Sequence, residues 1–394
     1  MKRMKVYIHA LLICAGLSSF SQGVSKSILE EIKHRSEQSH SDALIIIKDG
    51  KVIHENYFGK AEKPIYIASA GKSLTSLAIG KLIDKKLLDS LDQPIYTIYP
   101  EWKQGRKKDV TVRMLMNHTS GIQNNLNASI ELEPAPDYKV DNIVKLALAA
   151  ELTDDPGSSI IYNNKAVALL GGIVKKLSGS NFDDFFAKEF FEPMNIVDYE
   201  WIKDKSGNPT VHGAFVIKAS DLAKFGILIL NDGVYKNARI ISEEWIDESL
   251  KQSQEFTPIW GLLWWRLPEY EKRIIDDSIW SSWKEAVVDG AFLDKMLPIK
   301  DKVFDSKDQF YAAMEHILGE QWPEALNREL PKSIKLSRRI YGEKIMAYYA
   351  DGYRGNYLVI IPETKIIAVR CADSQGFDYK TDFFPEFVSL VSKL

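Results

Sequence analysis

The spacing of apolar residues predicts different elements at the ends of the chain and in its middle. Near the N-terminus, apolar positions recur every fourth residue over 24–38, which predicts an amphipathic helix. Two strand-like runs follow in "ALIIIKDGKVIHENYFG", joined by Asp49-Gly50, a strong hairpin signal. The chain is then mostly helical in pattern to about residue 210. Runs rich in Ile, Val and Tyr return in "KIMAYYADGYRGNYLVIIP" and "KIIAVRCAD", and these predict strands.

Strands at both ends of a helical middle predict an α+β fold. We expect one mixed sheet built from both termini, with a helical lobe inserted between its parts. The expected sheet lobe is 23–68 with 211–394, and the expected helical lobe is 69–210. A segment over 268–344 is rich in charge and aromatic residues, and its apolar spacing predicts an extra helical insertion.

The first residues have the layout of a secretory signal. Basic residues precede an apolar run that ends near Phe20, followed by small and polar residues. We therefore expect a signal peptide over 1–22, export to the periplasm or beyond, and no membrane span after its removal. The run contains Cys14, so removal leaves Cys371 as the single cysteine, which excludes an internal disulfide.

The charge balance argues against nucleic acid as a partner. The 394 residues hold 51 Lys and Arg against 54 Asp and Glu, a net charge of -3, and the two signs are mixed along the chain. Nucleic-acid binding needs a basic stripe, and none is present. No H-E-x-x-H or similar spacing of metal ligands occurs either. We expect neither a metal nor another cofactor.

One stretch, "YIASAGKSLTSLAIGKLI", fits two motifs. Gly71-Lys72-Ser73 matches the end of a phosphate-binding loop, but the opening glycine of that loop would fall at Tyr66. The alternative frame is an S-x-x-K motif formed by Ser69 and Lys72. Residues three apart share one helix face, so the hydroxyl and the amine would lie side by side.

The S-x-x-K pair is sufficient in principle for nucleophilic catalysis. Serine attacks only when a base removes its proton, and a lysine amine can act as that base if burial lowers its pKa. A helix N-terminus at Ser69 would also favour developing negative charge. The same letters are equally compatible with a capping serine and a solvated lysine, so the motif needs support from elsewhere in the chain.

Two further stretches could supply that support. The first is Tyr162-Asn163-Asn164. The phenol of Tyr162, if it lay near the Lys72 ammonium, would have a pKa below the usual value of about 10 and could transfer protons. The Asn164 amide would orient Lys72 and a substrate carbonyl. In "ADGYRGNYLVIIPE", Gly352 would let a substrate approach a strand edge, and the backbone N–H of Tyr353 could form an oxyanion hole with that of Ser69. A glycine bulge in a twisted strand would explain the second stretch equally well.

Together these stretches resemble the serine β-lactamase and penicillin-binding-protein superfamily, nearest its class C β-lactamase-like and esterase branch. "LMNHTSGI", "PGSSIIYNNKAVALLGGIVKKLSG", "FFEPMNI" and "SDLAKFGILILNDGVYKNARIISEEWI" also look like family text in family order. The resemblance implies a β-lactamase/transpeptidase-like fold, a mainly antiparallel sheet flanked by helices. It implies that Ser69 is acylated, that Lys72 is its proton partner, that Tyr162 is general base and acid, and that Asn164 binds substrate and lysine.

The chain departs from this family at the strand beside the site. Members that process β-lactams resemble one another in a Lys-Thr-Gly or His-x-Gly triplet, whereas this chain has Ala350-Asp351-Gly352. The cation that would bind a substrate carboxylate is missing, and Asp351 adds unfavourable charge. Arg354 could replace it, because on a strand its side chain would share the face of Gly352.

The departure favours hydrolysis of a small-molecule or peptide-like ester or amide. A β-lactamase or DD-peptidase that uses Arg354 as anion anchor remains an alternative, as does a catalytically silent binding or sensing module. His118 and His212 are interpreted as structural loop residues, because no G-x-S-x-G elbow surrounds Ser69. The tryptophans could line an apolar pocket or pack a core and lid: Trp260, Trp264, Trp265, Trp280 and Trp283.

Overall fold

The computed structural model describes residues 26–123, 140–287, 289–331, 334–372 and 376–394. The expected signal peptide, 1–22, lies outside the described residues. The chain divides into two compact units: one runs up to Arg266 and resumes over Ala347–Leu394, and the other is Leu267–Met346. The segment expected as an insertion, 268–344, falls within the second unit.

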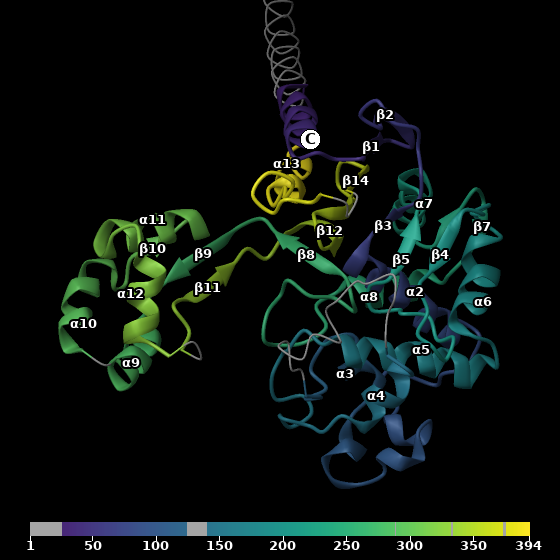
Figure 1. Cartoon of the computed structure of the whole chain (residues 1–394), viewed down its shortest axis with the longest axis horizontal. Helices are drawn as coiled ribbons and strands as arrows, with labels where there is room; N and C mark the ends of the chain where they lie inside the picture. Colours follow the sequence, from purple (N-terminus) through teal and green to yellow (C-terminus); the bar gives the residue numbers. More distant parts are fainter. Residues whose placement is uncertain (1–25, 124–139, 288, 332–333, 373–375) are drawn as a thin grey trace, which may run out of the picture. The chain divides into compact units, whose positions relative to one another are not determined.

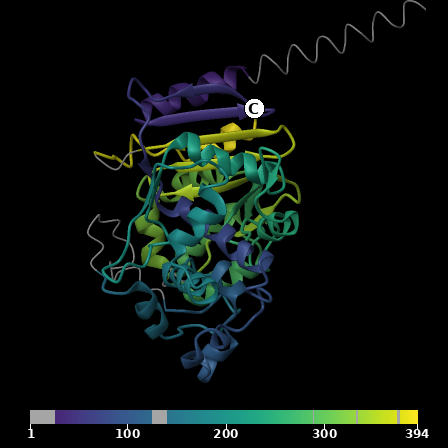
Figure 2. The ribbon, with the colours of Figure 1, turned by 90° about the vertical axis from the view of Figure 1, so that its right-hand side faces the viewer.

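The first unit is built on a six-stranded sheet that joins both ends of the chain. Its order is β2-β1-β14-β13-β12-β8. Strand β1 pairs antiparallel with β2 and β14, and β13 pairs antiparallel with β12 and β14. In Figure 2 the purple N-terminal strands lie beside the yellow C-terminal ones. The strands are β1 Ala43–Lys48, β2 Lys51–Asn56, β8 Trp265–Pro268, β12 Ile345–Gly352, β13 Asn356–Ile361 and β14 Ile366–Cys371.

The local sequence explains two features of this sheet. Asp49 and Gly50 both have positive φ, 50° and 73°, the backbone that a two-residue hairpin requires. Helix α7, Ala219–Leu230, packs on β1, β13 and β14. It can approach closely because a Cβ at Gly226 would lie 2.5 Å from the Ile367 side chain. The predicted hairpin and the predicted α+β class are confirmed (Figure 1).

Helix α2, Gly71–Asp84, packs against α5, and its first ten residues are all buried. A helix buried on every side has no polar face, which is why apolar and small residues dominate it. Among the described residues, no helix has both the length and the apolar character needed to cross a membrane. The other helices of this unit are α3 Val112–Met116, α4 Ile143–Ala149, α5 Asn164–Ser178, α6 Phe182–Phe186, α8 Glu243–Leu250 and α13 Phe387–Val391, with further residues 26–38 also helical.

Short strands complete the first unit. A three-stranded antiparallel sheet has the order β3-β5-β4, and β6 pairs with β7 in a small hairpin. Strand β3 leads directly into the segment that carries Ser69, so this small sheet fixes where that segment begins. The strands are β3 Ile65–Tyr66, β4 Tyr199–Trp201, β5 Phe215–Ile217, β6 Val234–Tyr235 and β7 Ala238–Arg239.

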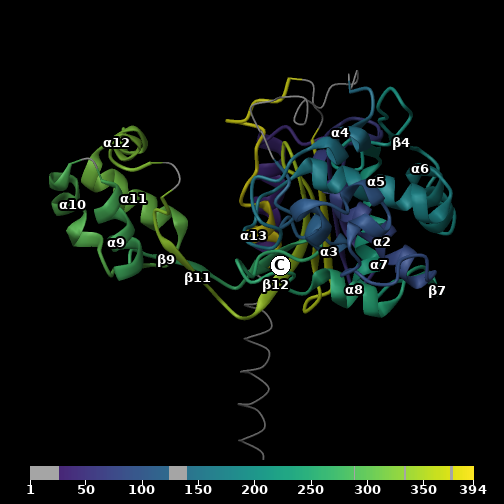
Figure 3. The same cartoon turned by 90° about the horizontal axis from the view of Figure 1, so that it is seen from below.

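The second unit has its own core and is not purely helical. In its described residues, helices α9, α10, α11 and α12 lie beside a three-stranded sheet of order β10-β9-β11 (Figure 3). The expectation of a helical insertion was incomplete, because strands of two to four residues are too short to show an alternating pattern. Trp280 and Trp283 pack in this core. The elements are β9 Glu271–Ile274, α9 Asp277–Ala286, α10 Gly290–Met296, β10 Val303–Phe304, α11 Lys307–Leu318, α12 Trp322–Glu329 and β11 Arg338–Tyr341.

Candidate active site

Ser69 lies in a tight turn between β3 and α2. The turn is the 3-10 segment η1, Ala68–Ala70, and α2 follows it at once. Ala68 has a φ of 49°, a left-handed backbone that costs a non-glycine residue about 1–2 kcal/mol. This strained turn leaves Ser69 half-buried at the start of α2, between two fully buried alanines. Strain of this kind tends to occur where a side chain must be presented for function.

Lys72 contacts Ser69 one turn further along. Its Nζ donates to Ser69 Oγ at 2.9 Å and also to the backbone carbonyl of His212. The Lys72 side chain is only 3% exposed, and burial lowers its pKa from 10.5 to about 7. Near neutral pH a substantial fraction of this amine is uncharged. The arrangement therefore provides a base within hydrogen-bond reach of a serine hydroxyl.

Tyr162 approaches the same pair from the loop before α5. Its side chain is hydrogen-bonded with Ser69, and the Lys72 Nζ lies 4.8 Å from the centre of its ring. Asn163 anchors the loop, because its side chain caps α5 by accepting from Ala166 N at 3.0 Å and donates to a neighbouring carbonyl. The structure thus brings Ser69, Lys72 and Tyr162 together.

The pKa of Tyr162 is raised, which contradicts the expected lowering. Burial is the largest cause, and the carboxylate of Asp351 raises the pKa further, whereas the hydrogen bond with Ser69 lowers it. The expected lowering relied on the charge of the Lys72 ammonium, which is only partial near neutral pH because the pKa of that amine is about 7. Tyr162 is therefore a neutral phenol at neutral pH, suited to donate a proton or relay one.

The end of β12 lies against the turn that carries Ser69. A Cβ at Gly352 would lie 2.1 Å from the carbonyl oxygen of Ile67 and 3.1 Å from the amide nitrogen of Ala70. Only glycine permits this approach. Tyr353 follows directly, with its side chain 48% exposed. The contact sets the backbone of the predicted oxyanion hole beside Ser69.

Gly352→Ala is expected to lower kcat/KM by about tenfold or more, because small misplacements of reacting groups can cost up to ~10²-fold. Its methyl group must push β12 away from the Ser69 turn, at a cost of about 1–3 kcal/mol of stability. Steady-state kinetics and a thermal melt test this. Gly290→Ala is the control, since its added Cβ meets open space. Unchanged kinetics in Gly352→Ala would contradict the proposed role of this contact.

Arg354 does not occupy the place expected of it. It lies in the turn between β12 and β13, with a φ of 73°, and Gly355 N donates to Gly352 O at 3.1 Å across that turn. Its guanidinium lies 5.1 Å from the ring centre of Tyr353 and 5.8 Å from that of Phe377. The expectation that Arg354 shares a strand face with Gly352 is wrong, because β12 ends at Gly352.

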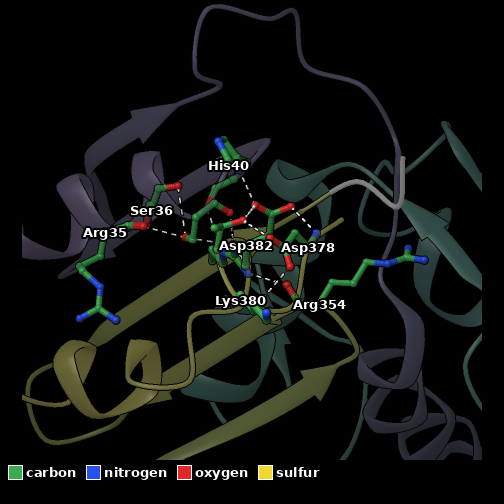
Figure 4. Close-up of polar contacts among 11 residues, drawn as sticks. Arg35, Ser36, His40, Arg354, Asp378, Lys380 and Asp382 are labelled. Atoms are coloured by element: carbon green, nitrogen blue, oxygen red, sulfur yellow. Dashed lines mark hydrogen bonds and ion pairs between the residues drawn. The ribbon is translucent and has the colours of Figure 1, made fainter. Parts of the chain in front are cut away.

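A buried arginine that the sequence argument missed holds this turn in place. Arg370, on β14, is fully buried, and burial lowers the pKa of its guanidinium to about 10. A Cβ at Gly355 would lie 2.3 Å from its Nη1, so the turn packs directly on the guanidinium. Figure 4 shows the polar contacts around this region. The guanidinium donates to the carbonyls of Arg354, Gly355, Ser39 and Asp382 and to Ser41 Oγ, at 2.6–2.9 Å.

A cavity lies over Ser69, and Lys72, Tyr162, His118 and Asp351 share its wall. Trp260, Trp264 and Trp265 supply much of its apolar surface, whereas Trp280 and Trp283 belong to the core of the second unit. Four residues that were predicted to bind substrate do not line this cavity in the described chain: Asn164, Gly352, Tyr353 and Arg354. Asn164 is the first residue of α5.

His118, interpreted from the sequence as a structural loop residue, lies in the wall of the cavity. Its ring centre lies 4.8 Å from that of Tyr162 and 5.0 Å from that of Trp260. Burial, helped by the charge of Lys72, lowers its pKa to about 3, so the ring is neutral. Its Nδ1 accepts from Asn163 N at 3.2 Å. His118 therefore orients the Tyr162 loop, a role that no sequence motif indicated.

The chain matches the profile of the Beta-lactamase family over residues 28–383. It belongs to this family of serine hydrolases. It is 22% identical over 240 residues to a 6-aminohexanoate-dimer hydrolase of Paenarthrobacter ureafaciens, covering 56% of this chain and 60% of that protein. The chain spans 28–60% of the length of curated relatives that it matches.

Solved structures show the same fold. A putative β-lactamase from Bacteroides dorei aligns with a TM-score of 0.63 and 20% identity over 94% of this chain and 98% of its own. EstCE1, described as a hydrolase with promiscuous acyltransferase activity, aligns with a TM-score of 0.59 and 12% identity over 93% and 99%. The predicted β-lactamase/transpeptidase-like α+β fold is confirmed.

Proposed function

We propose that this protein hydrolyses an ester or amide bond of a small-molecule or peptide-like substrate through an acyl-enzyme on Ser69. The observation that carries the proposal is the 2.9 Å contact between Ser69 Oγ and a lysine amine whose pKa is about 7. Serine and base meet in the wall of a cavity, where a substrate carbonyl can reach them.

The geometry supports a specific assignment of proton transfers. The neutral amine of Lys72 takes the proton of Ser69 Oγ as that oxygen bonds to the substrate carbonyl carbon. The backbone N–H groups of Ser69 and Tyr353 hold the resulting oxyanion. The Tyr162 phenol then gives its proton to the departing oxygen or nitrogen and regains one from the Lys72 ammonium.

Deacylation follows the same route in reverse. A water molecule attacks the ester formed with Ser69, and its proton passes to the Lys72 amine, either directly or through Tyr162. The bond between Ser69 Oγ and the acyl carbon breaks as Oγ regains a proton from the lysine. The products are the free acid and the original serine, so protons and atoms balance over the cycle.

The cavity disfavours β-lactams and D-Ala-D-Ala peptides as substrates. Both carry a carboxylate, and the carboxylate of Asp351 faces the same cavity. Arg354, the residue predicted to bind a substrate carboxylate, lies in a turn against Tyr353 and Phe377. Similarity to the 6-aminohexanoate-dimer hydrolase of Paenarthrobacter ureafaciens and to the hydrolase EstCE1 supports hydrolysis as the reaction class.

Export is part of the proposal and rests on the N-terminal sequence alone. The basic residues and apolar run over 1–22 support secretion to the periplasm or beyond. The proposed substrate would then be met outside the cytoplasm.

Intact-mass spectrometry after incubation with reactive probes tests the acyl-enzyme. We expect a fluorophosphonate and p-nitrophenyl esters to add to the wild type, penicillin to add slowly or not at all, and Ser69→Ala to remain unlabelled. Ser73→Ala is the matched control on the same helix and should label normally, because the Ser73 hydroxyl donates to Leu263 O. Rapid capture of penicillin would favour the β-lactamase alternative. A folded protein that forms no adduct with any probe would favour a silent binding module.

A further inference from the structure

The cavity wall contains a carboxylate, Asp351, that forms no ion pair with a lysine or arginine among the described residues. Asp351 lies on β12, opposite Tyr357 on β13, and its side chain lines the cavity beside Tyr162. Burial raises its pKa to about 6, so the carboxylate is mostly ionised at neutral pH. Across the described parts of the chain, no lysine or arginine forms an ion pair with it. Asp351 is half-buried, so its carboxylate has lost part of its hydration and a cation beside it would be stabilising.

The Lys72 amine donates to other groups and forms no ion pair with Asp351 among the described residues. Those groups are the Ser69 hydroxyl and the His212 carbonyl, and burial alone lowers the pKa of the amine. The carboxylate of Asp351 acts on the Tyr162 phenol and raises its pKa. Asp351 therefore also opposes ionisation of Tyr162, the candidate proton relay.

The surroundings of Asp351 are aromatic. Trp260 and Trp265 meet edge to face with ring centres 4.8 Å apart, and Trp265 stacks on Tyr349 at 6.1 Å. Tyr349 lies two residues before Asp351, so the two side chains leave the same face of β12. Aromatic faces together with a carboxylate are the combination that binds organic cations such as ammonium groups.

We propose that the cavity recognises a substrate bearing an ammonium or quaternary ammonium group, with Asp351 as its counter-ion and Trp260 and Trp265 packed around it. This inference rests on the proposed function and names its substrate class. In members that process β-lactams, a cation of the protein binds a carboxylate of the substrate. Here the two charges would be exchanged, with the anion on the protein and the cation on the substrate. The substrate cation would also offset the unfavourable effect of Asp351 on Tyr162.

Three p-nitrophenyl esters of similar chain length test this proposal. One has a 4-(trimethylammonio)butanoyl group, the second its neutral isostere 5,5-dimethylhexanoyl, and the third an anionic 4-carboxybutanoyl group. We expect kcat/KM of the wild type to favour the cationic ester over the neutral one by about tenfold or more, as a desolvated cation contact predicts, and the anionic ester to be the poorest. In Asp351→Asn the ratio of cationic to neutral ester should fall to within about threefold of unity.

The ratio is the readout, so a general loss of activity in the variant does not affect the conclusion. Asp247→Asn removes an exposed carboxylate on α8 and should keep the wild-type ratio. Equal kcat/KM for the cationic and neutral esters in the wild type would overturn the proposal, as would a preference that persists in Asp351→Asn.

A binding measurement separates failure of this proposal from failure of the proposed hydrolysis. Butyltrimethylammonium is titrated into Ser69→Ala while tryptophan fluorescence is followed, because Trp260 and Trp265 line the proposed site. We expect saturable quenching that weakens about tenfold or more in Ser69→Ala/Asp351→Asn. If no ester is hydrolysed but this binding is seen, the hydrolase assignment fails and the cation site stands. Absence of saturable quenching overturns the cation site itself.

Discussion

Lys72→Met should lower kcat/KM for ester hydrolysis by about 10³-fold or more, within the range that general bases contribute. The substitution removes the only amine in contact with Ser69 Oγ in the described chain while retaining an unbranched side chain of similar length. The hydroxyl then has no nearby group to take its proton, so attack on the carbonyl becomes slow. Steady-state kinetics on a p-nitrophenyl ester, with a thermal melt to establish folding, measure the effect.

The pH profile identifies the amine as the base. Only the deprotonated amine can accept a proton, and its pKa is about 7. In the wild type kcat/KM should therefore be low in acid, rise through about pH 7 and level off above it. Lys72→Arg keeps a cation that does not lose its proton, so it should be as impaired as Lys72→Met. Lys85→Met, at an exposed lysine, is the control. Activity within tenfold of the wild type in Lys72→Met would remove Lys72 from the mechanism.

Tyr162→Phe should cut turnover by roughly 10²-fold, as expected for loss of a proton relay. The phenylalanine ring can keep the packing of Tyr162 against His118 and Trp260, so the fold and its melting temperature should change little. The hydrogen bond with Ser69 and the proton given to the leaving group are both lost. The rise of the pH profile near 7 should persist, because it belongs to Lys72.

The leaving group distinguishes a proton donor from a base at position 162. Departure of p-nitrophenolate needs no proton, whereas an alkyl alcohol or an amine must be protonated as it leaves. In acylation, Tyr162→Phe should therefore be more damaging for an alkyl ester or an amide than for a p-nitrophenyl ester. Tyr199→Phe, at a ring packed on Phe191, is the matched control. Full activity of Tyr162→Phe on all substrates would exclude the phenol from the reaction.

Local sequence patterns predicted the features that depend on local geometry. The hairpin at Asp49-Gly50 follows from turn residues that tolerate positive φ. The pairing of Ser69 with Lys72 follows from their spacing, because residues three apart on a helix share a face. These elements are determined largely by residues close in sequence, so a pattern of letters is enough to find them.

Contacts between distant segments were not predictable in the same way. The direction of the Tyr162 pKa shift depends on Asp351, almost two hundred positions later in the printed sequence. The place of His118 in the cavity wall required the loop before α5 to fold back on it. Nothing in the strand text around Arg370 indicated that its guanidinium supports the turn at Gly355. The position of Arg354 in a turn could have been predicted, because the two glycines in "DGYRGN" are typical of a tight turn.

The most direct test of the central claim is to locate the acyl group. The wild type is mixed with a p-nitrophenyl ester, quenched in acid within the first turnovers and digested, and the peptides are sequenced by tandem mass spectrometry. The acyl mass should appear on the peptide that contains "ASAGK" and fragment to Ser69. An acyl group on another residue, or continued turnover with no adduct at Ser69, would contradict the account.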